Sequence, residues 1–111
     1  MTAAPTLTPA LALDYLRELS VDIRAGVVLD PAGKLLAGPD EFHAAARDLL
    51  DAAGDADEVH VSTADGAVFA ARSERHAVVV VCGRFALPSL MRYDLRLILA
   101  DLAGGERPEA A

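Results

Sequence analysis

The sequence has 111 residues, the size of one ordinary domain, and 53% of them are hydrophobic, which favours a folded core with disorder only at the ends. Its formal net charge of −7 repels a phosphate backbone and an anionic membrane surface on average, so neither nucleic acid nor membrane is an expected partner. No apolar run could span a bilayer, residues 1–9 lack the pattern of a signal peptide, and the single Cys82 cannot form an internal disulfide, so we expect a cytoplasmic protein.

Helices are indicated by their end signals and by apolar residues at helical spacing. Thr8 followed by Pro9 is an N-cap and a first-turn proline, which predicts a helix over 9–19. Its apolar positions are Leu11, Tyr15, Leu16 and Leu19. A second helix is predicted between Pro39 and Gly54, with an apolar stripe of Phe42, Ala45, Ala46, Leu49, Leu50 and Ala53. A third is predicted over 87–103, ended by Gly104 and Gly105, with a stripe of Leu87, Leu90, Met91, Leu95, Ile98, Leu99 and Leu102.

Strands are indicated by alternation and by turn residues between the runs. The predicted strands are 23–30, 34–37, 58–63, 67–72 and 76–82. The first and last are apolar on both faces and should be covered on both; Ile23, Ala25, Val27 and Leu29 are expected to share one face. In 58–63, Val59, Val61 and Thr63 are expected on a buried face and the alternate residues on a polar one. The turn signals are Asp30-Pro31-Ala32-Gly33, Asp65-Gly66 and Ser73-Glu74-Arg75.

This order of elements predicts an α+β domain, with an antiparallel five-stranded sheet between helices on both faces, rather than a parallel doubly wound fold. Placing the first hairpin beside the last strand gives the strand order 2-1-5-4-3. That order puts the valine-rich strand 76–82 in the centre, where its apolar pattern belongs. We expect a flexible lead over 1–8, one domain over 9–103 and a disordered tail over 104–111.

Several segments resemble a known family. The stretch 26–37, GVVLDPAGKLLA, has the apolar strand, Asp, short turn with Gly and apolar return of the first hairpin of roadblock domains. The stretch 59–63 with Asp65-Gly66 and 68–70 resembles their second hairpin, and the run 77–81 and the closing leucine-rich helix complete the pattern. The chain therefore resembles the roadblock family, which has a roadblock/profilin-like α-ββ-α-βββ-α fold, over about residues 9–103.

The resemblance implies a homodimer or heterodimer in which the third strand pairs antiparallel with its mate and the second helices pack side by side. The expected interface residues are Phe42, Ala46, Leu49, Glu58, Val59, His60, Val61, Ser62 and Thr63. Roadblock domains serve as dynein light chains, as scaffolds and, in bacteria, as regulators of small Ras-like GTPases. The resemblance thus implies a homodimeric protein-interaction module whose partners are a second copy and a small GTPase or related signalling protein.

No residue pattern in the sequence is typical of catalysis, of a metal site or of a cofactor site. Gly33-Lys34 lacks the earlier glycine and the following hydroxyl of a phosphate-binding Walker loop. The three histidines share no helix face and have no cysteine pair, so zinc is not expected; they are His43, His60 and His76. Cys82 is expected to be an inert buried residue. We therefore expect no catalytic, cofactor-binding or metal-binding residues, and no enzyme.

Two alternatives stay open from the sequence. A ligand sensor of the PAS or GAF kind has the same sheet order, but it needs a roomy pocket with polar groups, whereas the inward residues here are small aliphatics. A small enzyme would need a nucleophile, a base and an orienting group, and no such set is present. Arg72, Arg75 and Arg84 lie near strand ends, but nothing marks one of them as an arginine finger. Asp94 is expected on a solvated helix face.

Overall fold

The computed structural model describes residues 7–20 and 22–106. Within them the chain forms three α-helices, one short 3-10 helix and a five-stranded antiparallel sheet in the order β2-β1-β5-β4-β3, which confirms the predicted fold class and strand order. The elements are α1 (Pro9–Leu19), β1 (Ile23–Leu29), β2 (Leu35–Ala37), η1 (Asp40–Phe42), α2 (His43–Ala52), β3 (Glu58–Ser62), β4 (Ala67–Arg72), β5 (Ala77–Cys82) and α3 (Pro88–Glu106). No helix in these residues is long and apolar enough to cross a membrane.

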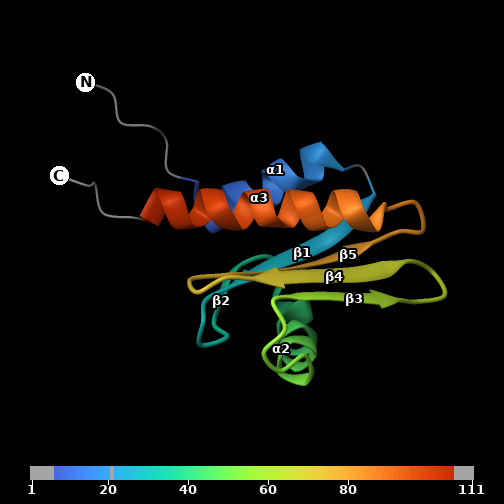
Figure 1. The fold of residues 1–111 in the computed structure, drawn as a ribbon, viewed down its shortest axis with the longest axis horizontal. Coiled ribbons are helices and arrows are strands. Elements are labelled where there is room, and N and C mark those ends of the chain that lie inside the picture. The colour runs from blue at the N-terminus through green and yellow to red at the C-terminus, as the bar shows by residue number, and fades with distance from the viewer. Residues whose placement is uncertain (1–6, 21, 107–111) are drawn as a thin grey trace.

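The sheet separates two apolar cores. Figure 1 shows α1 and α3 side by side on one face of the sheet and α2 on the other. Successive residues of a strand point to opposite faces, so β5 sends Val78 and Val80 into the core under α1 and α3, and Val79 into the core under α2. The run of valines therefore requires helices on both faces, and it occupies the centre of the sheet as predicted.

A β-bulge at the start of β1 changes the face that Ile23 covers. Ile23 is paired with Cys82 and Ala25 with the next residue, Val81, so two steps along β1 match one along β5. Ile23 consequently packs in the core under α1 and α3, whereas Val27 packs under α2. The expectation that these two residues share a face is wrong, because strict alternation does not hold across a bulge.

The first hairpin has the predicted turn. Gly33 has φ +90°, a conformation that glycine adopts without strain. The Oδ1 atom of Asp30 accepts hydrogen bonds from the backbone N–H groups of Ala32 and Lys34, at 2.9 Å each. The Asp30 side chain thus satisfies two backbone donors that the short turn leaves unpaired.

The helix ends follow the predicted signals in part. The Oγ1 atom of Thr8 accepts a hydrogen bond from the backbone of Leu11 at 3.2 Å, so Thr8 is the N-cap of α1, and Gly54 after α2 has φ +63°. α3 instead continues through Gly104 and Gly105 to Glu106, so the prediction that these glycines end it is wrong. Of the predicted lead, Leu7 packs against the core; residues 1–6 and 107–111 lie outside the described residues.

The buried stripe of α3 is narrower than predicted. Met91, Leu95 and Ile98 are buried, but Leu87 is 63% exposed and Leu90 is 50% exposed. Asp94, expected in solvent, is only 5% exposed. Helical periodicity locates an apolar side of the helix, but only the packing against the sheet and α1 decides which part of that side is covered.

Candidate interaction surface

β3 is one of the two outer strands of the sheet, and the other, β2, has only three residues. The backbone N–H of Thr63 donates to the carbonyl of Gly66 at 2.8 Å, next to the end of β3. Because backbone groups alternate in direction along an antiparallel ladder, those of Glu58, His60 and Ser62 point away from β4. With no proline or lysine in the strand, this margin is open to pairing with another strand.

The two faces of β3 differ in what they contact. On the α2 face, Val59 is partly buried, but Val61 is 40% exposed, so the prediction that its face is buried is wrong for the single chain. On the other face, the ring of His60 stacks on Phe69, with 4.5 Å between the ring centroids. Val61 is left exposed because α2 covers only part of this face of the sheet (Figure 1).

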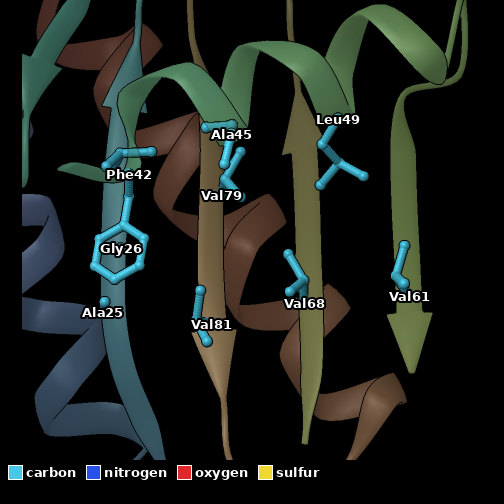
Figure 2. Close-up of a pocket in the computed structure, with 11 residues that line it drawn as sticks. Ala25, Gly26, Phe42, Ala45, Leu49, Val61, Val68, Val79 and Val81 are labelled. Carbon is cyan, nitrogen blue, oxygen red and sulfur yellow. The ribbon is translucent and has the colours of Figure 1, made fainter. Parts of the chain in front are cut away.

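An apolar hollow of about 220 Å³ lies between α2 and this uncovered part of the sheet. Figure 2 shows Phe42 and Leu49 on the helix side of the hollow and Val61 and Val68 on the strands. The full lining consists of Ala25, Gly26, Val27, Phe42, Ala45, Ala46, Leu49, Val61, Val68, Val79 and Val81. None of these side chains is polar, so the hollow offers apolar contact area that reaches the open margin at β3.

The predicted interface residues gather around this margin. Ala46 and three other members, Phe42, Leu49 and Val61, line the hollow. The remaining members are residues of β3 or, in the case of Thr63, directly follow it. The structure therefore brings the set together on one edge of the molecule, and their participation in an interface stays a prediction.

The side chain of Glu58 is held within its own chain. Nε of Arg92 donates to Oε1 at 2.9 Å, and Nε of Arg96 donates to Oε2 at 2.7 Å. The hydrogen bond from Arg96, and after it the one from Arg92, lowers the pKa of Glu58 below its ordinary value. These contacts tie β3 to α3, and no local sequence signal predicts them, because the partners lie 34 and 38 residues apart.

Removing the charge of Glu58 is expected to make the protein less sensitive to acid. A carboxyl group whose pKa is depressed in the folded state contributes stability above its unfolded pKa, and that stability is lost as pH falls through the folded pKa. Glu58→Gln should therefore be less stable than the wild type at neutral pH and converge with it in acid. Urea unfolding curves measured along a pH series test this; a stability difference that does not change with pH would contradict it.

Arg72 fastens the end of α2 to the sheet. Its Nε donates to the carbonyl of Ala56 at 2.9 Å and its Nη1 to that of Leu50 at 3.4 Å, while its Nη2 donates to the carbonyl of Gly54. The carbonyl of Leu50 lies in the last turn of α2, where carbonyls lack partners inside the helix, and those of Gly54 and Ala56 lie in the loop that follows; the guanidinium donates to all three. These bonds give Arg72 a structural role in place of that of an arginine finger.

Cys82 is not suited to nucleophilic chemistry. It is 2% exposed, and burial, with a smaller contribution from the charge of Asp22, raises its thiol pKa to about 11. The thiol therefore stays protonated at neutral pH. Within residues 7–20 and 22–106, no group of three or more His, Cys, Asp or Glu side chains is placed to hold a metal ion.

Asp94 lies in a largely covered position of α3. It is 5% exposed, and its carboxylate makes no hydrogen bond or ion pair among the described residues. Desolvation raises the pKa of Asp94 above its ordinary value. The ionised carboxylate therefore lowers the stability of the fold at neutral pH, and this cost falls as pH decreases through the raised pKa.

Replacing Asp94 with asparagine is expected to stabilise the protein slightly at neutral pH, since the amide is isosteric and carries no charge to desolvate. The gain should shrink in mild acid, where the wild-type carboxyl group becomes protonated. Chemical denaturation of both proteins at the two pH values measures the effect. Asp14→Asn, at an exposed position of α1, is the control and should leave the free energy of unfolding almost unchanged. A destabilised Asp94→Asn protein would contradict the reasoning.

No protein-family model matches this sequence, and no curated protein matches it. Solved structures do match. A Roadblock/LC7 domain from Streptomyces avermitilis aligns with a TM-score of 0.65 at 15% identity, covering 84% of this chain and 92% of that one. The chain has the roadblock fold. The gliding protein MglB from Thermus thermophilus aligns with a TM-score of 0.67 at 16% identity, covering 95% of this chain and 93% of that one.

Myxococcus xanthus MglB aligns with a TM-score of 0.66 at 13% identity, covering 99% of this chain and 98% of that one. The roadblock fold thus accounts for nearly all of the chain, and the similarity lies in the path of the backbone much more than in shared side chains. The resemblance inferred from the two hairpins is confirmed at the level of the fold.

Proposed function

We propose that this chain is a homodimeric protein-interaction module that pairs through β3 and scaffolds or regulates a small Ras-like GTPase or a related signalling partner. The observation that carries the proposal is the open margin of β3, whose outward backbone groups lie beside the apolar hollow under α2. An uncovered strand edge next to uncovered apolar surface is an aggregation hazard for a monomer, and pairing with a second copy removes it.

The geometry also supports a particular register. In an antiparallel pair related by a two-fold axis, the residue on the axis lies opposite its own equivalent, and residues at equal distances before and after it lie opposite each other. Centring the axis on His60, the middle residue of β3, places Glu58 opposite Ser62 of the mate and uses the outward backbone groups of all three residues. The mate then brings its own α2 toward the hollow that Val61 borders.

Size-exclusion chromatography with light scattering tests the dimer. We expect twice the chain mass at micromolar concentration, and a monomer at that concentration would sink this half of the proposal. The GTPase half is tested separately, by titrating purified small Ras-like GTPases of the same source, loaded with GDP or with a non-hydrolysable GTP analogue. We expect binding that depends on the nucleotide; equal or absent binding in both states across the set would contradict it.

We also propose that the protein acts in the cytoplasm and catalyses no reaction of its own. The protonated Cys82 thiol and the structural contacts of Arg72 support the absence of catalysis, because neither side chain is placed as a nucleophile or as an arginine finger. Turnover of an ester or phosphoester panel that a single substitution abolishes would overturn the proposal.

A PAS- or GAF-like sensor is the second candidate, and the apolar hollow is the observation that favours it. Its volume of about 220 Å³ is below the usual range of about 300–1,000 Å³ for small-molecule pockets, and its lining has no polar side chain to orient a ligand. A thermal-shift screen of metabolites distinguishes the two functions: a large, saturable shift favours the sensor, whereas uniform small shifts favour the interaction module.

A further inference from the structure

The α1 and α3 layer exposes most of the large apolar side chains found on the surface of the described chain. Leu11 is 52% exposed, Tyr15 41% and Leu19 39% on α1. Leu90, on α3, is 50% exposed. Figure 1 shows this layer on the face of the sheet opposite α2, away from the hollow described above. Clustered apolar exposure of this kind is typical of an interaction surface.

The exposed residues of the two helices face one another. Ala10, Asp14 and Arg17 of α1 border a hollow against β2, so Leu11, Tyr15 and Leu19, on the opposite flank at spacings of four, are turned toward α3. On α3, Arg92 and Arg96 reach Glu58 of β3, so Leu90, Asp94 and Asp101 occupy the flank turned toward α1. We define the α1–α3 seam as these six residues: Leu11, Tyr15, Leu19, Leu90, Asp94 and Asp101.

The charge of the seam is acidic. Among the described residues, these two facing flanks carry Asp94 and Asp101 but no lysine or arginine. Asp101 is exposed, whereas Asp94 is 5% exposed and its carboxylate makes no hydrogen bond or ion pair among the described residues. The side chain of Asp94 is thus largely covered by apolar neighbours while its carboxylate has no cation beside it, and such a group attracts a cation from a partner.

We propose that the α1–α3 seam docks a segment of a partner protein that presents a lysine or arginine between apolar side chains. The apolar residues of that segment cover Tyr15, Leu19 and Leu90, and its cation pairs with Asp94. A long basic side chain suits this geometry, because its aliphatic stem packs on apolar walls while its charged head reaches the carboxylate. The site lies on the opposite face from α2 and does not depend on the proposed dimer.

Three synthetic amphipathic helical peptides test the proposal. They share a leucine face and differ at one central position of that face, which carries lysine, norleucine or glutamate. Titrated into the ¹⁵N-labelled protein, the lysine peptide should shift the amide signals of Tyr15, Leu90 and Asp94 saturably and bind at least about tenfold more tightly than the other two. No saturable shift, or equal binding of the norleucine peptide, would overturn the proposal.

Two variants separate the role of Asp94 from a general loss of structure. Asp94→Asn is expected to fold and to lose the preference for lysine over norleucine, whereas Asp14→Asn, on the other flank of α1, should keep it. If Asp94→Asn kept the preference for the lysine peptide, the proposal would be contradicted. It would also be contradicted if phosphatidylglycerol vesicles shifted the same amide signals more strongly than the lysine peptide does. Light scattering on the same samples reports the dimer, so the two proposals can fail independently.

Discussion

Replacing His60 with proline should abolish the dimer while the chain still folds. Because the backbone N–H of His60 points away from β4, proline at this position removes no hydrogen bond of the sheet within the chain. It does remove a donor from the proposed strand pair and sets a pyrrolidine ring against the mate. We expect the dissociation constant of the dimer to rise at least about 100-fold, which corresponds to about 2.7 kcal/mol of binding free energy.

Light scattering across a dilution series, with circular dichroism for the fold, measures this effect. His60→Ala is the matched control: it also loses the ring stacked on Phe69, but it keeps the backbone donor and should remain a dimer. Val61→Pro is the opposite control, since the backbone of Val61 bonds to β4 and its loss should damage the fold itself. A folded His60→Pro protein that is still a dimer would rule out pairing through β3.

Truncating Arg72 to alanine should lower the free energy of unfolding by about 2–3 kcal/mol, because three carbonyl groups lose a charged donor at once. The carbonyls belong to Leu50, Gly54 and Ala56, at the end of α2 and in the loop that leads to β3. The loss should therefore loosen the link between α2 and the sheet. Hydrogen exchange is expected to speed up first in the last turn of α2 and in this loop.

Guanidinium unfolding at neutral pH measures the magnitude. Arg84→Ala, which truncates an exposed arginine, is expected to change stability by no more than about 0.5 kcal/mol. Arg72→Lys should fall between Arg72→Ala and the wild type, since an ammonium group cannot span three carbonyls as a guanidinium does. If Arg72→Ala left the free energy of unfolding almost unchanged, these hydrogen bonds would be no stronger than the bonds to water that they replace.

The contacts of Arg72 and those of Arg96 lie close together at the beginning of β3. Arg96 binds the carboxylate of Glu58 and also donates from Nη1 to the backbone carbonyl of Arg72 at 3.4 Å and from Nη2 to that of Asp57 at 3.5 Å. α2, β4 and α3 are thus joined at the point where the outer strand starts. This arrangement holds the first residue of the open margin in place, which favours pairing because less freedom is lost when a partner strand arrives.

Local signals in the sequence predicted much of this structure correctly. The Asp30 turn, the Thr8 cap and the glycine after α2 each depend on a few neighbouring residues, and all three are found. The central position of β5 also follows from its own pattern, because a run of valines needs cover on both faces. The strand order predicted from the sequence likewise makes β3 an outer strand, although Val61 is more exposed than expected.

Features that depend on distant segments did not follow from the sequence. The bulge that turns Ile23 to the other face exists only in the pairing of β1 with β5, and the exposure of Leu90 depends on how α3 lies against α1 and the sheet. The low exposure of Asp94 has the same origin, because helical spacing cannot distinguish a solvated flank from one that a neighbouring helix covers.

What the sequence alone determined is the type and order of the elements and the strand order. Periodicity, caps and turn residues act over a few residues, so they can be recognised without the fold. Only the tertiary structure decided the contacts of Glu58 with Arg92 and Arg96, the cap that Arg72 places on α2, and the acidic seam between α1 and α3. Packing brings these groups together from segments far apart in the chain, and a pattern of neighbouring residues cannot predict such contacts.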